Sequence, residues 1–488
     1  QIGIPETKVR KIDDDTFIMS PAIFDILIRE APYLIAMQVE DITQISPVNK
    51  DDDIDEDPEL SIPDPTNEPI IGVIDTHFEK HVYFSKWVTY KNMQSPDIDI
   101  DADDYDHGTM VSSIIVDGPT LNPRLQDNCG RFQVRHFGVA KKGKNSSSFI
   151  MDAVEKIIEN NKDIKVWNFS LGSELEINRN FISPEAAKLD YLQFKNDIVF
   201  IVSGTNKPDN KNYPKKIGAP ADSINSIVVN SVDFSNQPAE YSREGPVLSF
   251  FNKPDLCYYG GTYEDRLTVY APYGKKKTFG TSFAAPWITR KMAYLIYKMG
   301  FTKEAAKALL IDSAAGWKKF NSPTTIAGYG VVPKKIENII QSENDEIRFV
   351  ISDKSLLYDT YNYNIPVPIY QETQPFIAKA TLCYFPNCSR NQGVDYTDTE
   401  LDLHFGRIKD NGIKSIDNNI QNDGSRCFLK EAKARALFRK WDNIKLIGEE
   451  LKDTPRARKV YDDGRWGISL KTKERLYGNY GRGLPFGV

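Results

Sequence analysis

The chain has 488 residues, of which 40% are hydrophobic, and 62 Lys and Arg stand against 68 Asp and Glu, for a net charge of −6. This composition excludes a wholly disordered or collagen-like chain and gives no support for general nucleic-acid binding. No apolar stretch approaches the roughly 18 residues of a membrane-spanning helix, so no contact with a membrane is predicted.

The first 68 residues predict two segments of different character. Residues 1–50 contain short apolar clusters at 26–28 and 33–37, which predict a small accessory or prodomain-like element with a helix and a strand. Residues 51–68 combine a run of acidic side chains with several prolines. Such a stretch cannot bury a core, and it predicts a linker.

Residues 69–342 predict an α/β domain. Strand-like apolar runs occur at 70–74, 166–169, 198–202 and 227–229. Helical periodicity occurs at 148–160, 184–195, 283–298 and 302–313. Continuous apolar strands that alternate with helices predict a parallel sheet with helices on both faces.

Residues 343–488 predict a separate β-rich domain with one helical segment. Strand-like runs occur at 347–351, 376–380 and 401–405, and residues 428–440 have a helical pattern. Several of the strands alternate apolar and polar residues, which is typical of antiparallel sheets with one solvated face.

The five cysteines are scattered and odd in number, so they predict free thiols and a reducing compartment. Cys383 and Cys388 have the spacing of half a zinc site, but no second pair follows, so neither a metal nor a cofactor is predicted. No signal peptide is visible after Gln1. Together these features predict a cytoplasmic protein.

Three short motifs carry residues suited to covalent catalysis. Asp75 ends the first buried run, His107 stands in Asp-His-Gly-Thr before a helical segment, and Ser282 stands in Gly-Thr-Ser at the start of another. A serine hydroxyl is a weak nucleophile that needs an adjacent base such as histidine. A carboxylate on the other ring nitrogen holds that histidine in the correct tautomer. The three side chains therefore predict a catalytic triad.

The order Asp, His, Ser and the flanking residues resemble the subtilisin-like serine peptidases, or subtilases, over about residues 69–340. This resemblance implies a serine endopeptidase that acts on protein or peptide substrates through an acyl-enzyme. It implies that Asn206, after the run 198–202, is the oxyanion donor, although Thr205 stands where the family usually has glycine. It also implies that Ser170, Leu171 and Gly172 pair with the substrate backbone.

The resemblance leaves several alternatives open. The layout of the whole chain is similar to cytoplasmic subtilases that work beside an AAA-type ATPase in phage defence, which implies a gating partner. A catalytically silent subtilase-fold scaffold and a secreted self-processing subtilase are the other two hypotheses. Residues 1–50 are either a removable propeptide or a permanent accessory element.

Polar residues near the predicted triad have less specific interpretations. Six aspartates between positions 97 and 106 predict a solvated loop, with steering of basic substrates and calcium binding as alternatives. We expect structural roles for the remaining histidines, which are His77, His81, His136 and His404.

Overall fold

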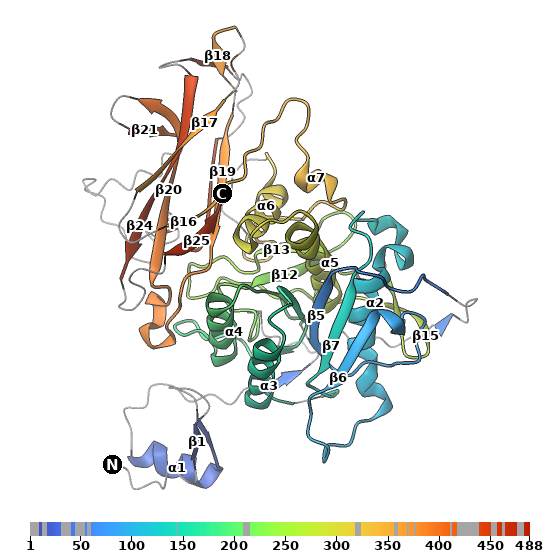
Figure 1. The fold of residues 1–488 in the computed structure, drawn as a ribbon. Helices are drawn as coiled ribbons and strands as arrows, with labels where there is room; N and C mark the ends of the chain where they lie inside the picture. The colour runs from blue at the N-terminus through green and yellow to red at the C-terminus, as the bar shows by residue number, and fades with distance from the viewer. Residues whose placement is uncertain are drawn as a thin grey trace.

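The computed structural model describes residues 9–11, 17–30, 41–43, 54–55, 60–143, 145–207, 215–317, 324–355, 360–367, 369, 371–374, 377–409, 412–416, 439–449, 456–460, 464–475 and 483–488. Its centre is a sheet of seven strands in the order β13-β12-β11-β9-β5-β7-β6 (Figure 1). The strands are β5 (Ile70–Asp75), β6 (Val88–Asn92), β7 (Gln133–Gly138), β9 (Val166–Phe169), β11 (Val199–Ser203), β12 (Ile227–Val232) and β13 (Leu256–Tyr259). Every neighbouring pair is parallel, which confirms the predicted sheet.

Helices cover both faces of this sheet, as the apolar strands require. They are α2 (Asp106–Leu121), α3 (Ser147–Asn160), α4 (Pro184–Lys195), α5 (Thr281–Ala293) and α6 (Lys303–Ala315), with a short α7 (Glu337–Ile340). A π-helical turn, Tyr294–Lys298, follows α5. The N-caps of α4 and α6 follow from sequence, because Ser183 and Thr302 accept hydrogen bonds from backbone N–H groups in the first turn.

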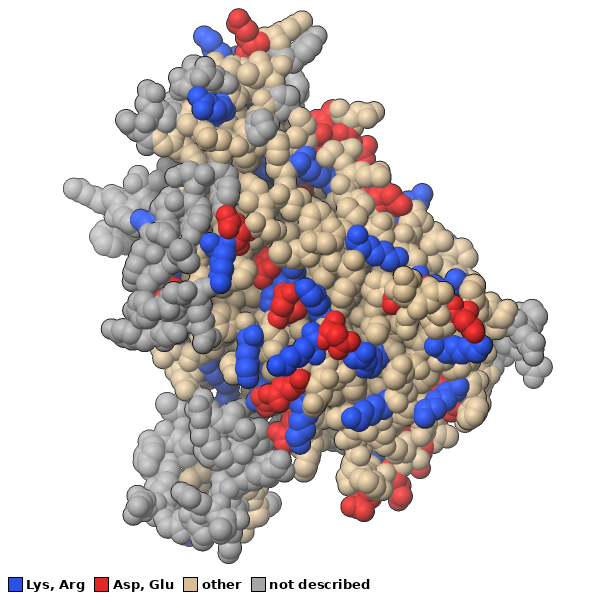
Figure 2. Space-filling view, in the orientation of Figure 1, with Lys and Arg blue, Asp and Glu red and all other residues tan. Residues whose placement is uncertain are grey.

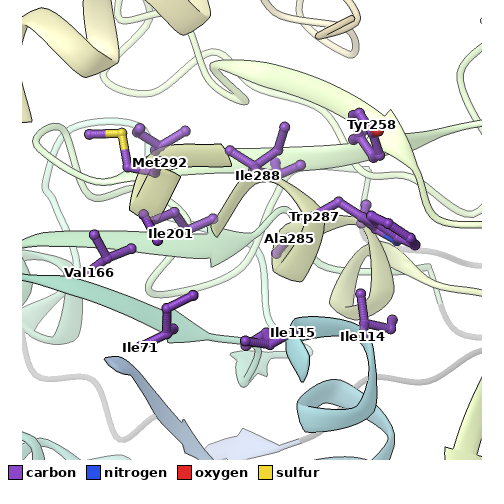
Figure 3. Close-up of a cluster of buried hydrophobic side chains, with 14 of the residues drawn as sticks. Ile71, Ile114, Ile115, Val166, Ile201, Tyr258, Ala285, Trp287, Ile288 and Met292 are labelled. Carbon is purple, nitrogen blue, oxygen red and sulfur yellow. The ribbon is translucent and has the colours of Figure 1, made fainter. Parts of the chain in front are cut away.

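Two apolar cores separate these helices into layers. Side chains of α2, α5 and α6 share one core with one face of the sheet, and those of α3 and α4 share the other. Figure 3 shows part of the first core, where α5 packs against both the sheet and α2. Its labelled side chains are Ile71, Ile114, Ile115, Val166, Ile201, Tyr258, Ala285, Trp287, Ile288 and Met292. The two helices that contain His107 and Ser282, α2 and α5, are therefore held by one continuous core.

The N-terminal region adds α1 (Pro21–Glu30) and two paired strands, β1 (Val9–Lys11) and β2 (Phe17–Met19). Its next strand, β3 (Asp41–Thr43), is the middle strand of a small antiparallel sheet. The outer strands are β8 (Asn145–Ser146) and β10 (Gly172–Ser173) of the main domain. The N-terminal segment thus pairs with the part of the chain that was predicted to bind substrate.

Another short antiparallel sheet contains two residues of the predicted acidic linker. Here β4 (Ile54–Asp55) pairs with β15 (Gly274–Thr278), which also pairs with β14 (Leu267–Ala271). The central residues of β15 are three lysines, whose charge is opposite to that of the acidic run.

The C-terminal region is β-rich, as predicted. One antiparallel sheet contains β16 (Ser352–Ser355), β25 (Leu484–Gly487), β19 (Lys379–Tyr384) and β22 (Ile444–Gly448). A second contains β17 (Thr360–Pro366), β24 (Arg465–Glu474), β20 (Thr399–Lys409) and β21 (Gly412–Ser415). The strands β18 (Thr373–Gln374) and β23 (Arg458–Lys459) form a further pair. The two larger sheets enclose a separate apolar core.

Two predicted C-terminal strands begin later in the structure, and one predicted C-terminal helix lies mostly outside the described residues. The run 347–351 is not a strand; β16 begins at Ser352, because pairing with β25 starts there, and Ile347 stays half exposed. The strand predicted over 376–380 begins at Lys379 instead, where pairing with β22 starts. The helix predicted over 428–440 lies outside the described residues over 428–438, and Arg439 and Lys440 are not helical.

The distribution of charge and of apolar helices agrees with the near balance of acidic and basic residues and the lack of long apolar stretches in the sequence. On the face in Figure 2, basic and acidic side chains are interspersed rather than gathered into areas of one sign. None of the helices in the described part of the chain is long and apolar enough to cross a membrane.

Candidate active site

Asp75 and His107 form a buried pair. Asp75 is the last residue of β5 and His107 lies in the first turn of α2. The Nδ1 atom of His107 lies 2.6 Å from Oδ1 of Asp75, and both side chains are almost wholly inaccessible to solvent. Thr76 supports the pair, because its N–H donates to Asp75 Oδ1 and its Oγ1 accepts from Gly108 N. Thr76 therefore fixes the Asp75 carboxylate directly and fixes His107 through the backbone of the next residue, Gly108.

The glycine after His107 allows this close approach. A Cβ atom at Gly108 would lie 2.6 Å from the carbonyl oxygen of His77 and 2.7 Å from that of Thr76. Real Cβ atoms do not approach backbone oxygens so closely. Glycine at this position therefore lets the start of α2 lie against the end of β5.

Ser282 lies in the first turn of α5, after Gly280, whose φ of +149° strongly favours glycine. The Ser282 hydroxyl donates to the carbonyl oxygen of Ser170 at 3.2 Å, and the Ser170 hydroxyl donates to the carbonyl of Ser282 at 3.3 Å. The ring of Phe283, the next residue, lies 5.6 Å from the His107 ring. The residue that follows Ser282 thus packs against the histidine of the buried pair.

The His107 nitrogen that faces away from Asp75 has no hydrogen bond in this structure. Among the described residues, no donor or acceptor contacts His107 Nε2. The Ser282 hydroxyl is directed to Ser170 instead. Catalytic hydrogen bonds are often absent or long in free enzymes and form only with substrate, so this arrangement is compatible with a triad.

Asn206 lies next to the same helix start. It follows β11, and its Oδ1 accepts from both the N–H and the hydroxyl of Thr281, at 3.0 and 2.9 Å. Thr281 directly precedes Ser282, so the Asn206 amide is fixed beside the predicted nucleophile. Thr205, the residue before it, has a φ of +64° and is buried.

The predicted substrate-pairing segment runs from Ser170 to Gly172, between β9 and β10. Asn168 donates to the Ser170 hydroxyl at 2.9 Å, which helps to orient it. Gly172 pairs with Thr43 of β3, and the neighbouring Ile42 is fully buried. An extended segment of the chain itself therefore occupies this edge.

Two further histidines lie beneath the site, in the packing roles expected for them. His77 is buried, and its ring contacts Tyr90 Oη at 2.6 Å and Gln94 Oε1 at 2.8 Å. His136 of β7 lies with Nε2 2.7 Å from the carbonyl oxygen of Thr76. Because a carbonyl only accepts, Nε2 carries the proton, and Nδ1 accepts from the Ser112 hydroxyl of α2 at 2.9 Å. His136 thus connects the residue after Asp75 with α2, the helix that contains His107.

Burial lowers the pKa of His136 from 6.5 to about 4. Since the folded-state value lies below the ordinary one, protonation favours the unfolded chain. The stabilisation is complete above about pH 6.5 and is lost as the pH falls toward 4, by about 3 kcal/mol in total at ~1.4 kcal/mol per pKa unit. Replacing His136 with glutamine should therefore flatten the fall in unfolding free energy over this range.

Urea unfolding at several pH values between 4 and 7 measures this effect. His81, whose side chain is 93% exposed, supplies the matched control, because His81→Gln should leave the slope unchanged. The pKa of His77 is also lowered by burial, so some slope should remain in the His136 variant. An identical slope in wild type and His136→Gln would contradict the prediction.

The sequence predicted that the aspartates before His107 lie in a solvated loop. The structure differs at Asp104. Asp104 is buried and accepts hydrogen bonds from the N–H groups of Asp101 and Lys142, at 2.8 and 2.6 Å. Asp103 pairs with the Lys142 side chain. Asp104 is therefore a structural residue that caps the turn leading into α2, which the alternating sequence pattern does not reveal.

Among the residues that the structure describes, no group of three or more His, Cys, Asp or Glu side chains has the geometry to hold a metal ion. The described cysteines, Cys129, Cys257, Cys383 and Cys388, are free thiols.

The chain matches the model of the subtilase family over residues 66–330. It is 27% identical to protein y4bN of Sinorhizobium fredii over 54% of this chain and 65% of that protein. It is 26% identical to subtilisin-like protease 2 of Pseudogymnoascus destructans over 47% of this chain and 51% of that protein. The chain thus spans less than two thirds of the length of either relative.

Solved structures also match. The epidermin leader peptide processing serine protease of Staphylococcus aureus has 19% identity and a TM-score of 0.44, over 56% of this chain and 76% of that one. The protease domain of PatA has 16% identity and a TM-score of 0.44, over 56% of this chain and 94% of that one.

Proposed function

The chain belongs to the subtilase family, and from this premise we propose that it is a serine endopeptidase that hydrolyses peptide bonds through an acyl-enzyme. Ser282 would be the nucleophile, His107 the general base and Asp75 the carboxylate that orients it. The observation that carries the proposal is the buried 2.6 Å contact between Asp75 and His107 Nδ1, with the start of α5 packed against the same imidazole.

The reaction follows from the tautomer that Asp75 selects. A carboxylate on Nδ1 keeps the proton there, so Nε2 is the basic nitrogen that takes the Ser282 proton as Oγ bonds to the peptide carbonyl carbon. The resulting imidazolium then gives this proton to the leaving amine as the C–N bond breaks. Water repeats the sequence on the acyl-enzyme and restores the Ser282 hydroxyl.

Developing negative charge on the carbonyl oxygen needs donors that are already in place. The Ser282 N–H lies at the start of α5, where the helix dipole favours an anion. Thr281 orients the Asn206 amide. It donates two hydrogen bonds to the amide oxygen, so the NH2 group of Asn206 points away from Thr281. We assign Asn206 as the oxyanion donor on this basis.

The hydrogen bond from Ser282 to Ser170 suggests how substrate completes the triad. Ser170 belongs to the segment that an extended peptide would pair with by main-chain hydrogen bonds. A substrate N–H that donates to the Ser170 carbonyl would compete with the Ser282 hydroxyl for that oxygen. The displaced hydroxyl would then be available to His107 Nε2, so substrate binding and nucleophile activation would be coupled.

The proposal includes regulation by the N-terminal region. β3 pairs with Gly172 on one side and with β8 on the other, so it would have to leave before a substrate could bind there. Protein or peptide substrates, a cytoplasmic location and release by an AAA-type ATPase in antiviral defence complete the proposal. The free thiols of the described cysteines support the reducing compartment.

Labelling with a fluorophosphonate tests the proposal, because the reagent bonds only to an activated serine. We expect an adduct on Ser282 by mass spectrometry, and none in Ser282→Ala. The variant Ile42→Asp places a charge at a fully buried position of β3 and should weaken the binding of this strand to β10. A loss of ~1.4 kcal/mol in that binding makes the edge available about tenfold more often. Ser282 should therefore be labelled at least about tenfold faster in this variant.

The control for the second arm is a substitution at an exposed residue of the same N-terminal region, Arg29→Asp. It should label at the wild-type rate. Absence of labelling in both folded wild type and folded Ile42→Asp would favour the alternative of a catalytically silent scaffold.

A further inference from the structure

If the proposed function holds, the position of one substrate side chain is restricted. It belongs to the substrate residue on the acyl side of the scissile bond. The carbonyl carbon of that residue must lie at Ser282 Oγ, and the Ser170 carbonyl, 3.2 Å from that atom, is an acceptor for its N–H. Its carbonyl oxygen must face Asn206. The side chain therefore projects between the segment 170–172 and the segment 204–206.

Thr205 fills the space between these two segments. Its Cγ2 lies only 2.7 Å from where a Cβ atom on Gly172 would be. Its Oγ1 accepts a hydrogen bond from Gly218 N at 3.1 Å and donates to the Gly204 carbonyl at 2.7 Å. The methyl group thus faces one glycine and the hydroxyl faces another, and 2% of the residue is exposed.

The backbone of the same region closes the remaining side. The Ser173 N–H donates to the Ala219 carbonyl at 2.7 Å, which joins the segment after Gly172 to the segment after Gly218. The Ala219 oxygen lies 3.5 Å from the Cβ position of Gly172. The Arg243 guanidinium donates to the carbonyls of Ser173 and Leu175, which holds this part of the wall in place.

Thr205 is also an unfavourable residue for its own backbone. Its φ of +64° lies in the left-handed region, where a β-branched side chain is strongly disfavoured and glycine is not. Residues held in such conformations concentrate at functional sites. Backbone geometry therefore does not account for threonine here, whereas its side chain does occupy the space beside Gly172.

We infer that Thr205 occludes the primary side-chain pocket and restricts cleavage to bonds that follow glycine, alanine or serine. This inference rests on the proposed function. A threonine adds three heavy atoms to a space that glycine would leave open. An aliphatic or aromatic substrate side chain would need that volume, and overpacking a rigid wall is unfavourable.

Two peptidyl diphenyl phosphonates that differ in one group test the inference. One carries a methyl side chain at the position that reacts with serine and the other carries a benzyl side chain. The rate of Ser282 phosphonylation is measured in the Ile42→Asp background, so that β3 does not limit access. We expect the methyl reagent to react about 30-fold faster or more in this protein, within the 10- to 200-fold range of pocket discrimination.

Thr205→Gly should lower this ratio at least about tenfold by accelerating the benzyl reagent. Thr205→Ser keeps the hydroxyl that bonds to Gly218 and removes only the methyl group, so it should give an intermediate ratio. The control is Ser249→Gly, which replaces another residue with positive φ, exposed and remote in sequence, and it should leave the ratio unchanged. Melting temperatures confirm that each variant is folded.

Equal rates for the two reagents before any change at Thr205 would overturn the inference, and so would a ratio that Thr205→Gly leaves unaltered. Failure of the proposed function is distinguishable from both. In that case a small fluorophosphonate, which needs no side-chain pocket, would also fail to label Ser282.

Discussion

Alanine at Ser282 should lower kcat for peptide hydrolysis by about 10⁶, and alanine at His107 should lower it by a similar factor. The nucleophile cannot react without its base, and the base has no other function in the first step. The double variant should therefore be no slower than either single variant, because residues that act as a unit are not additive. Hydrolysis of a peptide with alanine before the scissile bond, followed by mass spectrometry, measures these rates.

His81→Ala is the matched control, since His81 lies six residues after Asp75 but is exposed and contacts only Glu79 through its ring in the described structure. Its kcat should equal that of wild type. A Ser282→Ala protein that retains more than about 1% of wild-type activity would exclude Ser282 as the nucleophile, given the size of the expected loss.

The second large effect concerns the buried ion pair of Arg290 and Asp127, whose arginine also connects α5 to α2. Arg290 of α5 is fully buried and binds both carboxylate oxygens of Asp127, at 2.7 and 3.0 Å. It also donates to the carbonyl of Ile115 in α2. Arg290→Met should lower the free energy of unfolding by about 3–5 kcal/mol, because it leaves the Asp127 charge buried without its partner.

Urea unfolding at neutral pH measures this loss. The matched control is Arg124→Met, whose partner Asp265 is 43% exposed; such surface pairs contribute less than about 1 kcal/mol. Adding Asp127→Asn to Arg290→Met should recover part of the loss, since the buried charge is then removed. A loss of less than 1 kcal/mol in Arg290→Met would contradict the structural role of the pair.

The same pair has a pH dependence of known sign. Burial raises the pKa of Asp127, but the charge and hydrogen bonds of Arg290 outweigh it and bring the pKa below the ordinary 3.8. Ionised Asp127 therefore stabilises the fold above pH 3.8, and this stabilisation is lost as the pH falls through the lower folded-state value. In the unfolding experiments at pH 4–7, the pair should accordingly contribute little to the slope, in contrast to His136.

The main sheet and its helices could be predicted from the sequence because their apolar patterns are strong. α4 coincides with the predicted 184–195, and β5, β9, β11 and β12 all fall on predicted runs. Asp75, His107 and Ser282 could be named as candidates because each lies in a motif at the end of a strong element. The C-terminal strands β16 and β19 were placed less accurately, since the first residue of each strand depends on where pairing with its partner starts rather than on its own pattern.

Other parts of the site carry no signal that a single sequence reveals. The pairing of β3 with β10 joins residues about 130 positions apart through two backbone pairs, and backbone hydrogen bonds do not depend on side-chain identity. The contact of His136 with Thr76 depends on the register between β5 and β7. The direction of the Ser282 hydroxyl is a side-chain rotation that only local packing decides.

Thr205 could be predicted only in part from the sequence. Its departure from the usual glycine was visible in the sequence and raised a question about the backbone beside Asn206. The structure answers that question with a left-handed φ of +64° retained by threonine. What the sequence did not indicate is that its methyl group faces Gly172, because that contact joins two loops from different strands.

The covalent connection of β3 to the domain that it pairs with has a consequence for any assay. A tethered strand competes with substrate at an effective concentration of roughly millimolar, which the length of its linker sets. Dilution does not lower this value, so activity per molecule should be the same at nanomolar and micromolar protein. A peptide with the same affinity for the edge as β3 would have to exceed roughly millimolar concentration to displace it, and an untethered copy of the same strand would lose this advantage.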